Sequence, residues 1–133
     1  MRAQRGASGI AARRGKMSGS ATVRSNARSA LRCRTRRPAI ADQRRAFDSA
    51  IDEIASKFRP DLVIISAGFD AHRGDPLGQL LLTDDDFVQM TRVVKEWATE
   101  TCGGRVISCM EGGYNLETLG ETVRLHVREL QGV

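Results

Sequence analysis

The sequence predicts an α/β domain over residues 42–133, with a parallel sheet packed against helices. Three observations support this class. Segments with helical periodicity alternate with short apolar runs, as expected where helices connect parallel strands. The apolar runs are bounded by glycine or proline. The loops that follow the runs are rich in glycine and polar residues, and in open α/β sheets functional sites lie at the carboxyl ends of strands.

The first helix and strand occupy residues 44–65. Phe47, Ile51, Ile54 and Phe58 recur at helical spacing and indicate one apolar face. Pro60 disfavours helical geometry at the residue before it and ends the helix. The run Leu62–Ile65 follows, and consecutive apolar positions predict a strand that is buried on both faces.

Two more helices and one strand are expected between residues 83 and 130. Thr83 can cap the second helix, and three aspartates suit its positive end. Gly103 and Gly104 stop this helix, a strand is expected over 105–110, and Asn115 can cap the last helix. The predicted buried face of the second helix consists of Phe87, Met90, Val93, Val94 and Trp97. That of the last helix consists of Leu116, Leu119, Val123, Val127 and Leu130.

Residues 1–41 differ in composition from the remainder. They carry eleven basic residues and no acidic one, whereas residues 42–133 carry ten basic and sixteen acidic residues. Low hydrophobicity and unbalanced charge predict a disordered segment. It resembles an organelle transit peptide, it can bind nucleic acid through phosphates, or it has no selected role. We favour the last interpretation and do not expect a nucleic-acid partner.

Length and cysteine content exclude several other classes. A chain of 133 residues suits one domain, and its apolar stretches are too short for a membrane span. Three cysteines do not make a disulfide framework. Cys102 and Cys109 are expected to be reduced, partly buried thiols of a cytoplasmic protein.

The loop after the first strand offers two candidate metal ligands. Asp70 follows the strand directly, and its carboxylate suits zinc, calcium or magnesium. One carboxylate is not a metal site, however, and the same residue can instead cap a turn. His72 would lie on the same face of an extended segment, or it is a half-exposed loop histidine. His126 is expected at the boundary of the last helix rather than as a ligand.

The loop after the second strand contains the single tyrosine of the chain, Tyr114. Gly112 and Gly113 precede it and let the backbone approach a ligand closely or adopt positive φ. A phenol at a strand end can donate a hydrogen bond to a developing oxyanion. It can equally pack as the aromatic residue that closes the turn.

Together the two loops resemble the C-terminal portion of the histone deacetylase superfamily, which includes acetoin-utilisation proteins and acetylpolyamine amidohydrolases. The resemblance runs from about Asp42 to Val133. Its motifs are SAGFDAH at residues 66–72, DPLG at 75–78 and EGGYN at 111–115. It implies a three-layer α/β/α arginase-like fold and zinc-dependent hydrolysis of acetyl-lysine or acetylated polyamines.

The resemblance also implies roles for individual residues. Asp70 matches a zinc-binding aspartate of the family, and His72 matches a position that is not a zinc ligand there. Tyr114 matches the tyrosine that binds the substrate carbonyl and the oxyanion. Pro76 and Leu77 match positions near the wall of the acyl-lysine channel. Gly112 and Gly113 match the glycines beside that channel.

Other parts of the family pattern are missing. The chain has two histidines, and neither lies in the Asp-x-His-His segment or the tandem His-His pair of the family. We therefore expect a C-terminal deacetylase fragment, truncated on its N-terminal side, that binds no zinc stably and is inactive alone. The alternatives are half of a split deacetylase completed by another chain and, ranked lower, a nucleic-acid binder that uses the basic segment.

Overall fold

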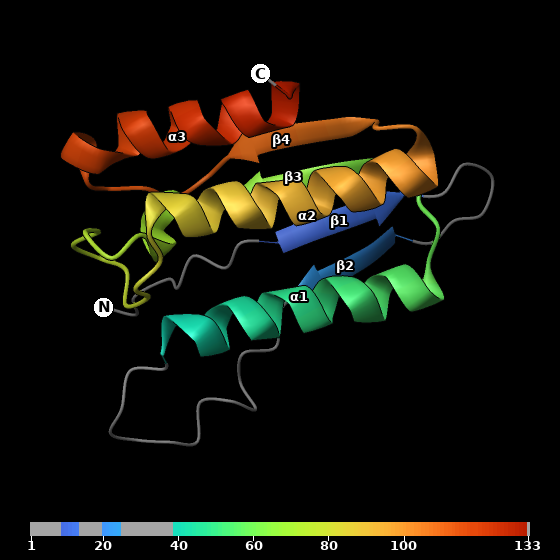
Figure 1. Cartoon of the computed structure of the whole chain (residues 1–133), viewed down its shortest axis with the longest axis horizontal. Helices are drawn as coiled ribbons and strands as arrows, with labels where there is room; N and C mark the ends of the chain where they lie inside the picture. Colours follow the sequence, from blue (N-terminus) through green and yellow to red (C-terminus); the bar gives the residue numbers. More distant parts are fainter. Residues whose placement is uncertain (1–8, 14–19, 25–38, 133) are drawn as a thin grey trace.

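The predicted alternation of helices and strands is confirmed in the computed structural model, which describes residues 9–13, 20–24 and 39–132 (Figure 1). Helix α1 (Ile40–Lys57) leads into strand β3 (Leu62–Ala67) and the short 3₁₀ helix η2 (Phe69–Ala71). Helix α2 (Asp84–Cys102), strand β4 (Val106–Met110) and helix α3 (Leu116–Gln131) follow. Strands β3 and β4 are parallel, as expected, with Ala67 opposite Met110 at their ends.

Two additional strands lie within the basic segment. Strands β1 (Gly9–Arg13) and β2 (Ser20–Arg24) pair with each other in antiparallel fashion, and β1 also pairs antiparallel with β3. The sheet order is β2-β1-β3-β4. The expectation of disorder is therefore corrected at these two stretches. A physical reason is that β1 provides partners for backbone groups along the edge of β3. The rest of this segment lies outside the described residues, and the boundary at residue 42 stays a prediction.

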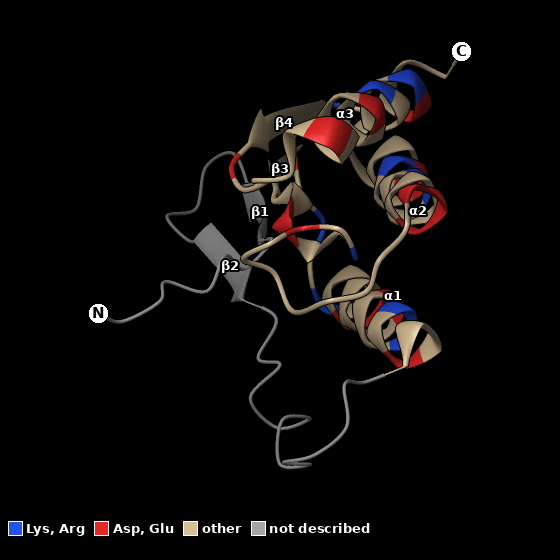
Figure 2. Cartoon of the chain, turned by 90° about the vertical axis from the view of Figure 1, so that its left-hand side faces the viewer, with Lys and Arg blue, Asp and Glu red and all other residues tan. Residues whose placement is uncertain are grey.

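The described helices lie together on one face of the sheet, as Figure 2 shows. Strand β3 accordingly alternates, with Val63, Ile65 and Ala67 buried and the intervening residues partly exposed. The prediction that β3 is buried on both faces is therefore wrong for the described part of the chain, because no described helix covers the second face. Ile107 of β4 is correspondingly 48% exposed. The two-layer arrangement leaves a three-layer fold unconfirmed.

The hydrophobic core lies between the sheet and the helices. Val63 from β3 and Val94 from α2 are among its most completely buried side chains, and Ile51 from α1 packs into the same cluster. Phe69, directly after β3, contacts the ring of Phe87 on α2 with centroids 5.5 Å apart. Each such buried side chain stabilises the fold by roughly 1.5–3 kcal/mol relative to exposure. The core therefore fixes η2, which begins the first strand-end loop, against α2.

Helix α2 begins and ends at the predicted residues. Thr83 accepts a hydrogen bond from the Asp86 backbone N–H, and the Asp86 carboxylate accepts one from the Thr83 backbone N–H, which makes a capping box. Gly103 adopts a left-handed conformation with φ of 63° and ends the helix. Asn115 caps α3 as expected by accepting from the Glu117 N–H.

The buried face of α3 differs from the predicted one. Leu116 is 86% exposed and Val127 is also exposed, whereas Thr122 and His126 are buried. Leu119, Val123 and Leu130 pack against the core as predicted. Polar residues occupy this face because their polar groups have partners: the Thr122 hydroxyl donates to the Asp84 carboxylate, and His126 contacts Thr91 and Ser108.

Two further expectations concern cysteines and membrane spans. Cys102 is buried, but Cys109 is exposed because it lies on the uncovered side of β4. Within the described residues, none of the helices has the length and apolar character needed to cross a bilayer.

Candidate active site at the ends of two parallel strands

The loops after β3 and β4 lie side by side, as the parallel pairing requires. The backbone N–H of Glu111 donates to the carbonyl oxygen of Ala67 at 2.9 Å, and the N–H of Phe69 donates to that of Gly112 at 2.7 Å. The ladder between the strands therefore continues past their ends. It places η2, which contains Asp70, beside the glycines that precede Tyr114.

Asp70 lies against Gly112. A Cβ atom at Gly112 would stand 2.7–2.9 Å from the carboxyl carbon and oxygens of Asp70, so only glycine leaves room for the carboxylate there. Gly78 also lies close to Asp70, because a Cβ atom at Gly78 would stand 1.7 Å from the backbone oxygen of Asp70. The close approach of Gly112 to Asp70 brings the two loops together at this carboxylate.

The electrostatic surroundings of Asp70 disfavour its charge. Burial raises the pKa of the Asp70 carboxyl above its ordinary value. A backbone hydrogen bond acts against this shift, and the neighbouring charge of Asp75 reinforces it. A carboxylate with a raised pKa at a strand end is typical of a functional position rather than of a stabilising ion pair.

His72 does not join Asp70. Its ring is 7% exposed, and Nδ1 accepts a hydrogen bond from the Gly74 backbone N–H at 3.1 Å. Nε2 lies 3.8 Å from the Asp84 carboxylate, and the ring stacks on Phe87. The alternative of a half-exposed loop histidine is thus wrong. Because Nδ1 already has a partner and Nε2 faces α2, this geometry favours Asp70 without His72.

Tyr114 and its neighbours form the second half of the site. The Tyr114 side chain is 55% exposed, and its backbone N–H donates to Oδ2 of Asp75 at 2.7 Å. Gly113 has φ of 141°, and a Cβ atom there would lie 2.6 Å from Cδ1 of Leu119. The predicted positive φ is confirmed, and it requires glycine at this position.

Pro76 and Leu77 lie on the exposed rim of the first loop, and the Leu77 side chain is 70% exposed. Asn115 links this loop to the second one, because its Nδ2 donates to the Gly74 carbonyl at 2.7 Å. The structure thus brings the backbones of all the predicted site residues into two joined loops.

Asp75, to which the sequence alone assigned no role, is hydrogen-bonded to both loops. Asp75 is 8% exposed, and its carboxylate accepts hydrogen bonds from three backbone N–H groups. Burial alone would raise the pKa of Asp75. The surrounding N–H groups of Tyr114, Leu77, Gly78 and Asn115 outweigh burial and hold the pKa below its ordinary value. The sequence shows the Asp-Pro pair that is typical of a turn. It does not show the contact between Asp75 and Tyr114, which are 39 positions apart.

His126 is also buried more deeply than expected. Its Nδ1 lies 2.7 Å from the Thr91 hydroxyl on α2, and Nε2 lies 2.8 Å from the Ser108 hydroxyl on β4. The Thr91 hydroxyl donates its proton to the Phe87 carbonyl. Nδ1 must therefore carry the proton of the neutral ring, which leaves Nε2 to accept from Ser108. His126 is a structural link between α2, β4 and α3.

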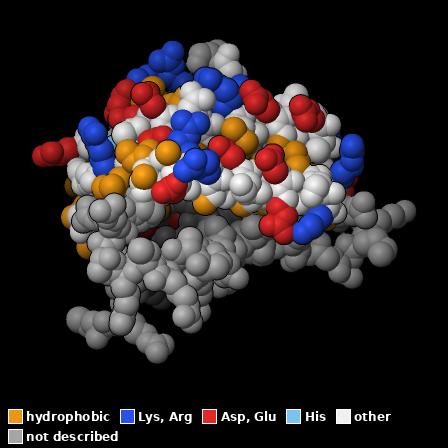
Figure 3. Space-filling view, turned by 60° about the horizontal axis from the view of Figure 1, so that its bottom comes forward, with side chains coloured by type: hydrophobic (Ala, Val, Ile, Leu, Met, Phe, Trp, Pro, Cys, Tyr) orange, Lys and Arg blue, Asp and Glu red, His pale blue; other side chains and the backbone are white. Residues whose placement is uncertain are grey.

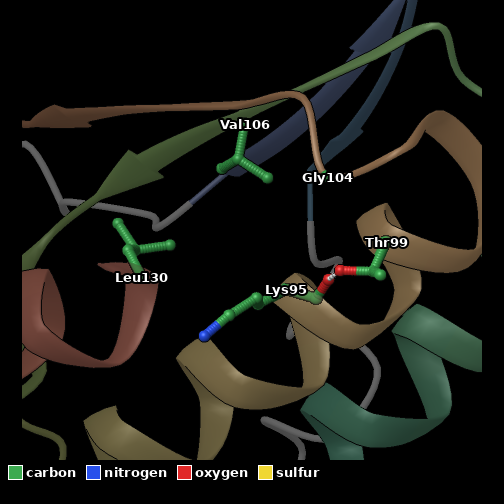
Figure 4. Close-up of a pocket in the computed structure, with 5 residues that line it drawn as sticks. All are labelled: Lys95, Thr99, Gly104, Val106 and Leu130. Carbon is green, nitrogen blue, oxygen red and sulfur yellow. Dashed lines mark hydrogen bonds between the residues drawn. The ribbon is translucent and has the colours of Figure 1, made fainter. Parts of the chain in front are cut away.

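A shallow cavity of about 180 Å³ lies away from these loops, near the start of β4 (Figure 4). It is lined by Lys95, Thr99, Gly104, Val106 and Leu130. It contains no carboxylate, histidine or cysteine side chain, and the Lys95 ammonium already donates to the Glu129 carbonyl at 2.7 Å. This cavity therefore does not compete with the strand-end loops as a catalytic site.

The chain is similar to known proteins over most of its length. The family model described as "Histone deacetylase domain" matches residues 18–130, so the match begins earlier than the expected Asp42 and includes β2. Rice (Oryza sativa subsp. japonica) "Histone deacetylase 10, chloroplastic" is 46% identical over 78 residues, which are 59% of this chain and 18% of that protein.

Two further relatives have similar identity. "Histone deacetylase 14, chloroplastic" of Arabidopsis thaliana is 42% identical over 67% of this chain and 21% of its own length. Human "Polyamine deacetylase HDAC10" is 42% identical over 69% of this chain and 13% of its own length. The chain thus spans about a fifth or less of the length of these relatives.

Proposed function

This chain belongs to the histone deacetylase family, and from that membership we propose that it contributes the carboxylate of Asp70 and the phenol of Tyr114 to a zinc-dependent amide hydrolase. The substrates are acetyl-lysine or acetylated polyamines. The observation that carries the proposal is the joining of the two loops, with the Asp70 carboxylate against Gly112, two positions before Tyr114. The names of the relatives support both substrate classes.

The residues present do not fit a complete zinc site. A catalytic zinc ion takes three protein ligands and keeps one open position. In the part of the chain that the structure describes, no cluster of three or more His, Cys, Asp or Glu side chains is suitably arranged to hold a metal. Asp70 is therefore one ligand at most, and the chain alone should neither bind zinc tightly nor hydrolyse acetyl amides.

The proposed contribution of the chain lies in binding and in charge stabilisation. The Tyr114 phenol donates a hydrogen bond to the oxygen that becomes negative when the acetyl carbonyl is attacked. One such donor is typically worth about 3–4 kcal/mol in the transition state. Pro76 and Leu77 present apolar surface to the alkyl chain of the substrate, and Gly112 and Gly113 leave space beside it.

We further propose that the complete enzyme has a three-layer α/β/α arrangement. The support is the uncovered face of the sheet, where Ile107 is exposed and Ile64 is only partly buried among the described residues. Apolar side chains on one side of a sheet are normally covered by another layer. A cytoplasmic location stays an expectation that rests on the reduced thiols.

Inactivity of the isolated chain is tested with the full 133-residue protein. We expect less than one tightly bound zinc per chain and no turnover of an acetyl-lysine peptide above the buffer rate. Tight zinc binding at one ion per chain, with turnover that Tyr114→Phe abolishes, would refute the claim of inactivity. Asp52→Asn on the exposed face of α1 is the matched control for changes of charge.

The alternative is a split enzyme, in which a second chain supplies the general base and the further zinc ligands. The observation that favours it is the pairing of the two strand-end loops, which carry Asp70 and Tyr114. Its test is co-expression with a polypeptide that carries an Asp-x-His-His segment, followed by co-purification and assay. If the two chains form an enzyme, Tyr114→Phe should lower kcat by about 10²–10³. Asp70→Asn should abolish zinc-dependent turnover, and Asp52→Asn should change neither. Failure of the two polypeptides to co-purify would end this alternative.

No observation on the described residues favours the nucleic-acid binder. Its eleven basic side chains lie in the basic segment, and their side chains are outside the described part of the structure. On the described surface in Figure 3, acidic and basic side chains are interspersed rather than gathered by sign.

A further inference from the structure

We propose that Asp75 is a positioning residue, whose carboxylate holds the backbone of Tyr114 at a fixed place relative to Pro76 and Leu77. This inference rests on the proposed function insofar as Tyr114 is the oxyanion donor. Asp75 itself is buried, so it would act on a substrate only through the two exposed side chains, Leu77 and Tyr114, that its hydrogen bonds place.

Each of the two carboxylate oxygens of Asp75 binds the backbone of a different loop. Oδ1 accepts from the backbone N–H groups of Leu77 and Gly78, both at 2.8 Å, and so closes the turn in its own loop. Oδ2 accepts from the backbone N–H of Tyr114 at 2.7 Å. The rigid, planar carboxylate of Asp75 therefore sets the distance between the backbone of Leu77 and that of Tyr114.

An ionised carboxylate is the group that suits this geometry. Both of its oxygens accept, whereas an asparagine at the same position offers one accepting oxygen and turns an NH₂ group toward a backbone N–H. Alanine would leave the three N–H groups without this acceptor. The pKa of Asp75 is held below its ordinary value, which keeps the group ionised at neutral pH.

Among the residues that the structure describes, Asp75 is the side chain whose hydrogen bonds join Leu77 and Tyr114. Asn115 also crosses between the loops, but it binds the Gly74 carbonyl and the cap of α3 rather than Tyr114 or Leu77. The Phe69 N–H donates a hydrogen bond to the Gly112 carbonyl. Gly112 lies between β4 and Gly113, the residue with positive φ. Between Gly113 and Asn115, the backbone N–H of Tyr114 is held by the Asp75 carboxylate.

The single tyrosine makes this inference directly measurable. Full-length protein labelled with ¹⁵N-tyrosine gives one backbone amide signal, that of Tyr114. An amide bound to a carboxylate should exchange with solvent at least ten-fold more slowly than the amide of an unstructured peptide of the same sequence. Exchange of the wild-type Tyr114 amide at the unstructured rate would overturn the proposal without any variant.

Substitution then assigns the effect to Asp75. In Asp75→Ala the Tyr114 amide should exchange at least ten-fold faster than in the wild type, and its signal should move upfield. In a second sample, labelled with ¹⁵N-tryptophan, the indole signal of the single tryptophan, Trp97 in the core, should stay in place and report that the fold is intact. Asp52→Asn should leave both signals unchanged. An unaltered Tyr114 signal in a folded Asp75→Ala protein would contradict the inference.

If Asp75→Ala does not fold, acid titration of the wild-type amide signal decides. The chemical shift of the Tyr114 amide should change at a pH below the usual range of aspartate pKa values, and the same change should persist in Asp70→Asn. If this change is absent in the wild type, or is lost in Asp70→Asn, the proposal is overturned. These measurements do not require turnover. Slow exchange that depends on Asp75, combined with no activity in any reconstituted complex, would therefore retain the positioning role and reject the deacetylase function.

Discussion

The Nε2 atom of His126 on α3 lies 2.8 Å from the hydroxyl oxygen of Ser108 on β4. This contact crosses from the helical layer to the strand that leads into the loop of Tyr114. Nδ1 of the same ring contacts Thr91 on α2, and the ring edge packs on Phe69 at 5.5 Å between centroids. A neutral, buried imidazole thus ties together the elements on which the candidate site is built.

Stability should fall in mildly acidic solution because of His126. Burial lowers the pKa of His126, so the unfolded chain binds the proton more strongly than the folded chain. The contribution of the neutral ring is complete above the unfolded pKa of about 6.5 and is lost as the pH falls through and below that value. Urea unfolding between pH 8 and pH 5 measures this slope.

Substitution of His126 by glutamine should remove that part of the pH dependence. It should also cost roughly 1–3 kcal/mol at pH 8, because the buried hydroxyl group of Thr91 loses a partner. His72 is retained in this variant, so the comparison isolates His126. An identical slope in the wild type and in His126→Gln would show that another group is responsible.

Gly78→Ala should destabilise the fold strongly. Its Cβ atom would lie 1.7 Å from the backbone oxygen of Asp70, so the backbone of one of the two loops must move. Forced overpacking typically costs about 1–3 kcal/mol. Gly120→Ala in α3 is the matched control, because nothing lies within 4 Å of its Cβ position. Alanine there should stabilise the helix by roughly 0.5–1 kcal/mol.

The two glycine variants should therefore shift the midpoint of thermal unfolding in opposite directions. Circular dichroism at 222 nm is sufficient to measure both midpoints. Equal midpoints for Gly78→Ala and the wild type would mean that the turn over Asp70 is not packed as the structure has it.

Asp70→Asn should leave the isolated chain as stable as the wild type at pH 7, or more stable by up to about 0.5 kcal/mol. The pKa of Asp70 is raised chiefly by burial, so the ionised form is favoured less in the folded than in the unfolded chain. Lowering the pH through the raised pKa relieves this cost in the wild type. The difference between the two proteins should consequently vanish at pH 3.

Urea unfolding at pH 7 and pH 3 tests this sign, with Asp52→Asn as the control. A clear loss of stability in Asp70→Asn at pH 7 would indicate that the carboxylate caps a turn. That was the structural alternative for this residue. Stability without the carboxylate would instead agree with a residue that is retained for chemistry.

The sequence by itself determined the local elements and their order. Thr83, Gly103 and Asn115 act on backbone groups within a few residues, so their spacing is sufficient to place the helix ends. The alternation of helices with the runs at β3 and β4 was sufficient to predict parallel pairing. Parallel pairing in turn placed Asp70 and the residues before Tyr114 at one edge of the sheet.

The tertiary structure alone decided three other features. Strand β1 is formed by pairing with β3, and such pairing leaves no periodic signal in a basic segment. Thr122 and His126 face the core because hydroxyl and carboxylate groups of distant elements provide their hydrogen bonds. The role of Asp75 emerges only when the turn at residues 75–78 meets Tyr114. Each of these features depends on polar partners far away in the chain, and local propensity and hydrophobic pattern carry no information about such partners.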